Sequence, residues 1–101
     1  MNIIKMTNST NGEYYFKRGY SNGMLLKRKA AIEDYNKFIR LKYRLPDAYF
    51  NAGLNCTADN DSLALYYFEK SLPINPDKVK VIHEINECQK RLKSGYNYSP
   101  I

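Results

Sequence analysis

Apolar residues recur every three or four positions along five successive stretches of this chain, the spacing typical of amphipathic helices. Turn-forming residues separate these stretches. The pattern predicts helices over about 11–26, 28–43, 46–57, 62–72 and 77–93. The prediction is therefore an all-α protein of about five helices, with one domain over 10–94. Residues 1–9 and 95–101 show no such pattern, and we expect them to be flexible.

Several residues indicate where these helices begin and end. Thr10 and Glu13 form the pattern of a capping box, which starts the first helix. The polar turn 59–61 offers a cap for the fourth helix. Pro73 should stop or kink that helix, since proline has no N–H to donate. Asn75-Pro76 then starts the last helix by a cap followed by a proline.

The last helix has one apolar side and one charged side. Its predicted apolar stripe consists of Ile82, Ile85, Cys88 or Gln89, and Leu92. The predicted charged side consists of Lys80, Glu84, Glu87, Lys90 and Arg91. A helix of this kind can cover the end of a stack of helices and present a polar back to water. We therefore interpret 77–93 as a capping helix.

The chain also repeats itself. Tyr15, Phe16 and Gly19 stand 34 positions before Tyr49, Phe50 and Gly53. Ala31, Tyr35, Lys37 and Ile39 stand 33 positions before Ala64, Phe68, Lys70 and Leu72. Self-similarity at such a period indicates a repeat architecture. Small residues at the two crossings allow close approach of paired helices, and the large Tyr35 and Phe68 fill the space between them.

This skeleton resembles the tetratricopeptide repeat, whose pattern joins a leading aromatic and a glycine to a later alanine, an aromatic and a closing proline. The matching positions are Tyr15, Gly19, Ala31 and Tyr35, then Tyr49, Gly53, Ala64, Phe68 and Pro76. The departures are Arg18 and Ala52 for leucine, Asn22 and Cys56 for tyrosine, and Tyr43 for the first closing proline. The resemblance implies antiparallel helix pairs in a short right-handed superhelix, with repeats at about 12–45 and 46–78.

The resemblance also implies a function, which is the binding of a protein or peptide in a concave groove lined by the first helix of each unit. The candidate groove residues are Phe16, Tyr20, Met24, Phe50, Asn51, Leu54, Lys80, His83 and Glu87. Phe16 and Phe50 are 34 apart, as are Tyr20 and Leu54, so each pair should stack into one stripe. The same side chains could instead pack between neighbouring helices, and the sequence leaves both readings open.

Charge suggests an alternative partner. The net charge is +6, with +7 through Pro46 and −1 after it. Lys37, Arg40 and Arg44 form a candidate basic patch in the first repeat. Such a surface attracts nucleic acid or an acidic partner, although a solvated outer face is also typical. Self-association is a third possibility, because two repeats are few for this architecture.

The sequence gives no sign of chemistry. His83 is the single histidine, and neither a phosphate-binding glycine loop nor a metal-spaced cluster occurs. We therefore expect no enzyme activity, no cofactor and no metal. Cys56 and Cys88 lack metal-ligand spacing, and without an export signal we interpret them as free thiols in the cytoplasm. No apolar run reaches about 18 residues, so we expect no membrane partner.

Overall fold

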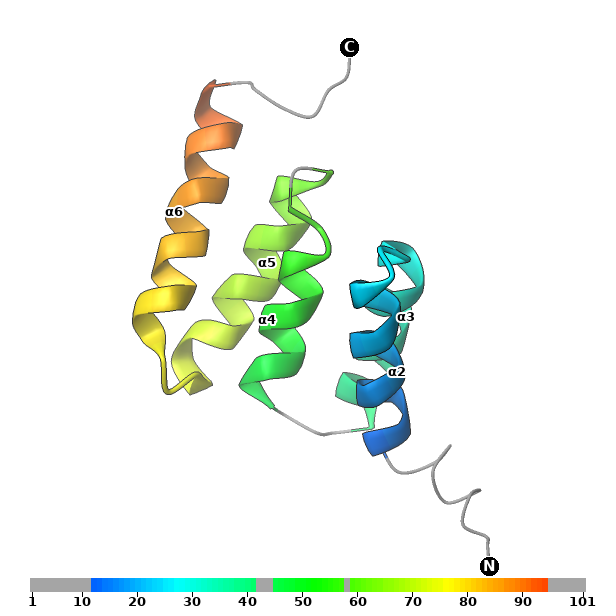
Figure 1. The fold of residues 1–101 in the computed structure, drawn as a ribbon. Helices are drawn as coiled ribbons and strands as arrows, with labels where there is room; N and C mark the ends of the chain where they lie inside the picture. The colour runs from blue at the N-terminus through cyan, green and yellow to red at the C-terminus, as the bar shows by residue number, and fades with distance from the viewer. Residues whose placement is uncertain (1–11, 42–44, 58, 95–101) are drawn as a thin grey trace, which may run out of the picture.

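The computed structural model describes residues 12–41, 45–57 and 59–94, and within these ranges it contains five α-helices and no strand (Figure 1). The α-helices are α2 (Glu13–Met24), α3 (Arg28–Arg40), α4 (Pro46–Leu54), α5 (Asp61–Ser71) and α6 (Lys78–Ser94). A 3-10 helix, η1 (Leu72–Ile74), follows α5. The all-α prediction is confirmed. The predicted flexible ends, Tyr43, Arg44 and the proposed cap residue Thr10 lie outside the described residues.

The helices form two antiparallel hairpins and one additional helix (Figure 1). Helices α2 and α3 make the first hairpin, α4 and α5 make the second, and α6 packs against α5. The two hairpins meet where α3 contacts α4. A side-chain hydrogen bond also joins them, because the Tyr67 hydroxyl of α5 donates to Asn36 Oδ1 of α3 over 2.6 Å. Consecutive helices therefore pack side by side along the chain.

In each hairpin the two helices cross at a small residue, and the two crossings occupy equivalent positions. A Cβ atom added to Gly19 of α2 would lie 3.2 Å from the Tyr35 ring of α3. A Cβ atom added to Gly53 of α4 would lie 2.6 Å from the Phe68 ring of α5. Both rings are almost fully buried. The glycines allow each aromatic ring to lie directly against the backbone of the facing helix, as the repeat pattern predicts.

The core runs through both hairpins and reaches α6. Its buried apolar members are Ala31, Tyr35, Phe38, Ala48, Phe50, Ala52, Cys56, Ala64, Tyr67, Phe68, Val81 and Cys88. Polar groups complete one end of this core. Ser71 Oγ donates to the carbonyl oxygen of Pro46 over 2.9 Å, and Asn75 Nδ2 donates to Ser71 Oγ over 3.0 Å. These buried bonds fix the junction between η1 and α6 against the beginning of α4.

The helix boundaries confirm some signals and correct others. Asn60 caps α5, because its Oδ1 accepts the Leu63 N–H over 3.1 Å. Helix α5 ends at Ser71, and the chain tightens into η1 at Pro73. The predicted capping box needs Thr10, which lies outside the described residues, and the N-cap of α2 in the structure is Gly12, which has no side-chain cap. Asn75 Oδ1 accepts the Asp77 N–H over 2.9 Å, as the predicted cap requires. Helix α6 begins only at Lys78, however, and Asp77 Oδ1 accepts the Lys80 N–H over 3.2 Å in its first turn.

The buried side of α6 differs from the prediction. Val81 and Cys88 are fully buried and Ile85 packs against the core, whereas Ile82 is 44% exposed and Leu92 is 37% exposed. The buried stripe therefore begins one residue earlier than the predicted one. Arg91, which we assigned to the charged outer side, is turned toward α5. The reason is electrostatic, because Arg91 Nε donates to the buried Asp61 carboxylate over 2.8 Å.

Candidate functional site

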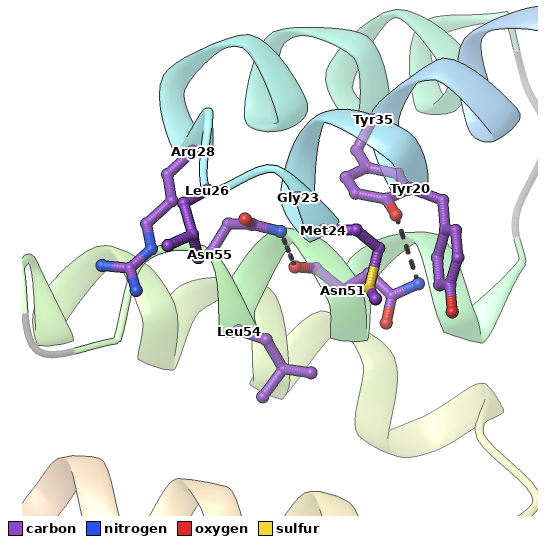
Figure 2. A pocket seen from close by; sticks show the side chains of 9 residues that line it. All are labelled: Tyr20, Gly23, Met24, Leu26, Arg28, Tyr35, Asn51, Leu54 and Asn55. Atoms are coloured by element: carbon purple, nitrogen blue, oxygen red, sulfur yellow. Dashed lines mark hydrogen bonds between the residues drawn. The ribbon is translucent and has the colours of Figure 1, made fainter.

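A pocket of about 240 Å³ opens between α2 and α4 (Figure 2). Its lining residues are Tyr20, Gly23, Met24, Leu26, Arg28, Tyr35, Asn51, Leu54 and Asn55. Helix α2, the turn after it and two residues of α3 supply one wall, and α4 supplies the other. The pocket thus lies on the side formed by the first helix of each hairpin, where the sequence predicts a groove.

The apolar side chains around this pocket are open to water. The exposed fraction is 56% for Tyr20, 67% for Met24 and 40% for Leu54. Tyr20 and Leu54 occupy equivalent positions, 34 residues apart, in α2 and α4. The free energy falls when a partner covers apolar side chains that are exposed beside a pocket. This part of the pocket can therefore hold an apolar group.

Amide side chains form the polar part of the pocket. Asn51 Nδ2 donates to the Tyr35 hydroxyl over 3.4 Å, and Asn55 Nδ2 donates to the Asn51 carbonyl oxygen over 2.8 Å (Figure 2). Burial raises the pKa of Tyr35, so its hydroxyl stays neutral at physiological pH. A Cβ atom at Gly23 would lie 3.3 Å from the Asn55 amide. Gly23 therefore allows α2 to approach α4 closely, a packing role that the sequence alone did not indicate.

The structure brings four of the nine predicted groove residues together in this pocket, namely Tyr20, Met24, Asn51 and Leu54. Phe16 instead packs inside the first hairpin, with its ring centre 5.5 Å from that of Tyr35. Phe50 is 8% exposed, and its ring centre lies 5.4 Å from that of Phe68. For these two residues the structure favours packing between helices, the alternative that the sequence left open.

The remaining three groove residues lie on α6, apart from the pocket. Lys80 places its Nζ 4.6 Å from the centre of the Phe50 ring, which it covers from the solvent side. His83 and Glu87 line a shallow hollow of about 470 Å³ together with Lys90. Glu87 pairs with Lys90 over 3.1 Å, and this hydrogen bond lowers the pKa of the Glu87 carboxyl. The nine residues therefore do not form one continuous surface.

The candidate basic patch is only partly described. Lys37 and Arg40 are exposed in the last turn of α3, and Arg44 lies outside the described residues. The Lys37 ammonium lies 5.5 Å from the centre of the Tyr15 ring. Neither Lys37 nor Arg40 lines the pocket.

Two ion pairs that each hold a buried carboxylate are features that sequence reasoning missed. Arg18 donates to Asp34 from Nε over 3.1 Å and from Nη2 over 2.8 Å, and Asn22 Nδ2 donates to the same carboxylate over 2.9 Å. The second pair is Arg91 with Asp61. The hydrogen bond to Asp34 raises the pKa of Arg18, so its guanidinium stays charged. Arg18 stands where the repeat pattern has leucine, and this departure was the available signal.

The two cysteines lie in the core. Cys56 and Cys88 are both buried free thiols. Burial raises the pKa of Cys56 to about 11 and the pKa of Cys88 to about 11. Both thiols are therefore protonated and poorly nucleophilic at neutral pH. Among the residues that the structure describes, no three His, Cys, Asp or Glu side chains gather closely enough to hold a metal ion.

Comparisons of the chain with protein-family models, with curated proteins and with solved structures found no match. Within the described ranges, no helix combines the length and the apolar character needed to cross a membrane.

Proposed function

We propose that this chain is a tetratricopeptide-type module that binds a peptide or a partner helix in the pocket between α2 and α4. The equivalent crossings at Gly19 and Gly53 support the repeat relationship, because each faces a buried aromatic ring from the second helix of its own hairpin. The buried thiols Cys56 and Cys88 suit a reducing compartment, and we place the module in the cytoplasm.

The observation that carries the proposal is the exposure of apolar side chains around a pocket that also offers polar groups. Tyr20, Met24 and Leu54 are all at least 40% exposed there. Covering such side chains contributes about 1.5–3 kcal/mol for each one that becomes fully buried. An apolar anchor of the peptide would lie against them, and the amides of Asn51 and Asn55 would orient its backbone.

A selection experiment with a matched control tests this proposal. Peptides are selected from a displayed random library. Their affinity is then measured by fluorescence polarisation for the parent protein, a pocket variant and a control variant. Tyr20→Ala with Leu54→Ala should weaken binding by at least about tenfold, the usual effect of truncating two anchors. The control is Tyr66→Ala with Leu63→Ala, which removes side chains of the same types and similar exposure from α5. The proposal fails if the library yields no peptide, or if the control loses as much affinity.

Nucleic-acid binding through the first repeat has less support. Arg18 is committed to Asp34, and Lys17 pairs with Glu13 over 3.1 Å, so part of the positive charge is neutralised internally. Binding of this kind would weaken steeply with added salt and with reversal of Lys37 and Arg40. A salt-sensitive complex with single-stranded RNA at micromolar protein would favour it over the peptide module.

A further inference from the structure

The turn between α2 and α3 carries six consecutive residues that are exposed, three apolar and then three basic. They are Met24, Leu25, Leu26, Lys27, Arg28 and Lys29. The exposed fractions of the three apolar residues are 67%, 65% and 71%. Single exposed leucines are common on protein surfaces, but a consecutive apolar run is unfavourable in water unless something covers it.

The backbone of this turn adds a second unfavourable feature. Leu26 has a φ of 62°, and it is the one non-glycine residue with a positive φ in the described ranges. The Lys27 N–H donates to the Asn22 carbonyl and the Leu26 N–H donates to the Gly23 carbonyl, the pattern of a Schellman helix end. Glycine is the residue that usually occupies such a left-handed position, because it has no Cβ. Here the position is occupied by the exposed Leu26, whose backbone conformation is strained.

The charges of the turn are placed unfavourably as well. Lys27 is the N-cap of α3 and makes no side-chain cap, and the first turn of α3 contains no acidic residue. The N-terminus of a helix carries positive partial charge and favours anions, so three cations there repel it. Arg28 lies 3.7 Å from Asp59, an exposed and weak pair. In the described part of the chain, no carboxylate forms an ion pair with Lys27 or Lys29.

We propose that this turn docks on the surface of an anionic lipid bilayer. Leu25 and Leu26 enter the boundary between headgroups and acyl chains, and Lys27 and Lys29 contact the phosphates and carboxylates of the headgroups. Two of the features that are unfavourable in water become favourable in this setting, since the leucines leave water and the cations meet anions. The combination of broken local rules in adjacent residues is typical of a functional site.

A bilayer fits this turn better than an acidic protein does. A protein partner would need a matching hollow for each protruding leucine, whereas the headgroup region accepts side chains of any shape. The proposal differs from the sequence-based expectation of no membrane partner, which considered only spanning segments. The turn shares Met24, Leu26 and Arg28 with the lining of the peptide pocket, whereas Leu25, Lys27 and Lys29 do not line that pocket and are the residues on which the test rests.

Sedimentation with lipid vesicles tests the proposal. One set of vesicles contains phosphatidylcholine alone, and the other contains about 30% phosphatidylserine, in about 0.1 M salt. The chain has no tryptophan, so Leu25→Trp supplies a single fluorophore at the predicted depth. We expect binding to the anionic vesicles only, with a blue shift of the tryptophan emission. Lys27→Glu with Lys29→Glu should weaken binding at least about thirtyfold, since each basic side chain near an anionic leaflet contributes about fivefold.

The matched control is Lys37→Glu with Arg40→Glu, which makes the same change of net charge at the other end of α3. It should weaken binding less than about threefold, because its effect is only long-range. Leu25→Ser should weaken binding several-fold with no change of charge, and it keeps the test decisive if the double variant does not fold. The proposal is overturned if anionic vesicles do not sediment the protein, if both charge reversals weaken binding equally, or if binding gives no blue shift. Binding without a blue shift would mean that the protein only adsorbs to the charged vesicle surface, as it would to an acidic protein, and that the side chain at position 25 stays in water.

Discussion

Replacement of Gly53 by alanine is the sharpest test of the hairpin packing. The added Cβ would lie 2.6 Å from Phe68 Cε1, 2.8 Å from Cδ1 and 3.0 Å from Cζ. Phe68 is fully buried, so its ring has no free volume to enter. Contacts this short require α4 and α5 to separate. Overpacking of a core costs about 1–3 kcal/mol, and the upper part of that range applies because three ring atoms are involved.

The same substitution also has a stabilising effect that must be subtracted. Alanine is favoured over glycine inside a helix by about 1 kcal/mol. Gly53→Ala should therefore lower the free energy of unfolding by about 2 kcal/mol in total, from an overpacking cost of about 3 kcal/mol. For a domain of this size that loss lowers the melting temperature by about 10 °C.

Gly19→Ala and Gly23→Ala serve as graded controls. At Gly19 the nearest atoms, in Tyr35 and Asp34, lie at 3.2–3.3 Å, so the packing cost and the helix gain should nearly cancel. At Gly23 the neighbour is the Asn55 amide at 3.3 Å, the end of a side chain that can move. We expect stability in the order Gly53→Ala, then Gly19→Ala, then Gly23→Ala as the most stable. Urea unfolding followed by circular dichroism at 222 nm gives these values. A Gly53→Ala protein as stable as the parent would refute the packing described at this crossing.

Three further predictions concern strain, buried charge and the thiols. Leu26→Gly should raise the free energy of unfolding by about 1 kcal/mol, because it relieves the positive φ of an exposed residue, and a thermal melt checks this. Arg91→Met should lower the free energy of unfolding by about 3 kcal/mol, because the fully buried Asp61 loses its two bonds to the guanidinium, and urea unfolding measures the loss. The pKa values of Cys56 and Cys88, raised to about 11 from 9.0, favour the protonated folded state. Their contribution should be complete below pH 9 and be lost as the pH rises to about 11, and unfolding curves across that range, compared with a Cys→Ala variant, test the sign.

The packing of the hairpins could be predicted from sequence because it depends on residue size at fixed spacing. Gly19 with Tyr35 and Gly53 with Phe68 occur at the repeat period, and each pair meets in the structure. Proline and asparagine signals likewise fixed the start of α4 and the cap of α5, since each acts on its own backbone.

The candidate site could be predicted only in part, because rotation of a helix by one residue changes which side chains it exposes. Phe16 and Phe50 carry the same periodicity as Tyr20 and Leu54, and only the structure separates the pair that packs against the core from the exposed pair. The inward turn of Arg91 had no signal in its own helix. It depends on Asp61, thirty residues away, whose burial the sequence does not reveal.

The most direct test of the proposed pocket is a ¹H–¹⁵N correlation spectrum of the labelled protein, recorded while a selected peptide is added. The account predicts that the largest shifts fall on the backbone amides of Tyr20, Met24, Asn51, Leu54 and Asn55, which line the pocket between α2 and α4. Saturable shifts centred instead on α5, around Leu63 and Tyr66, or on the outer side of α6, would contradict it.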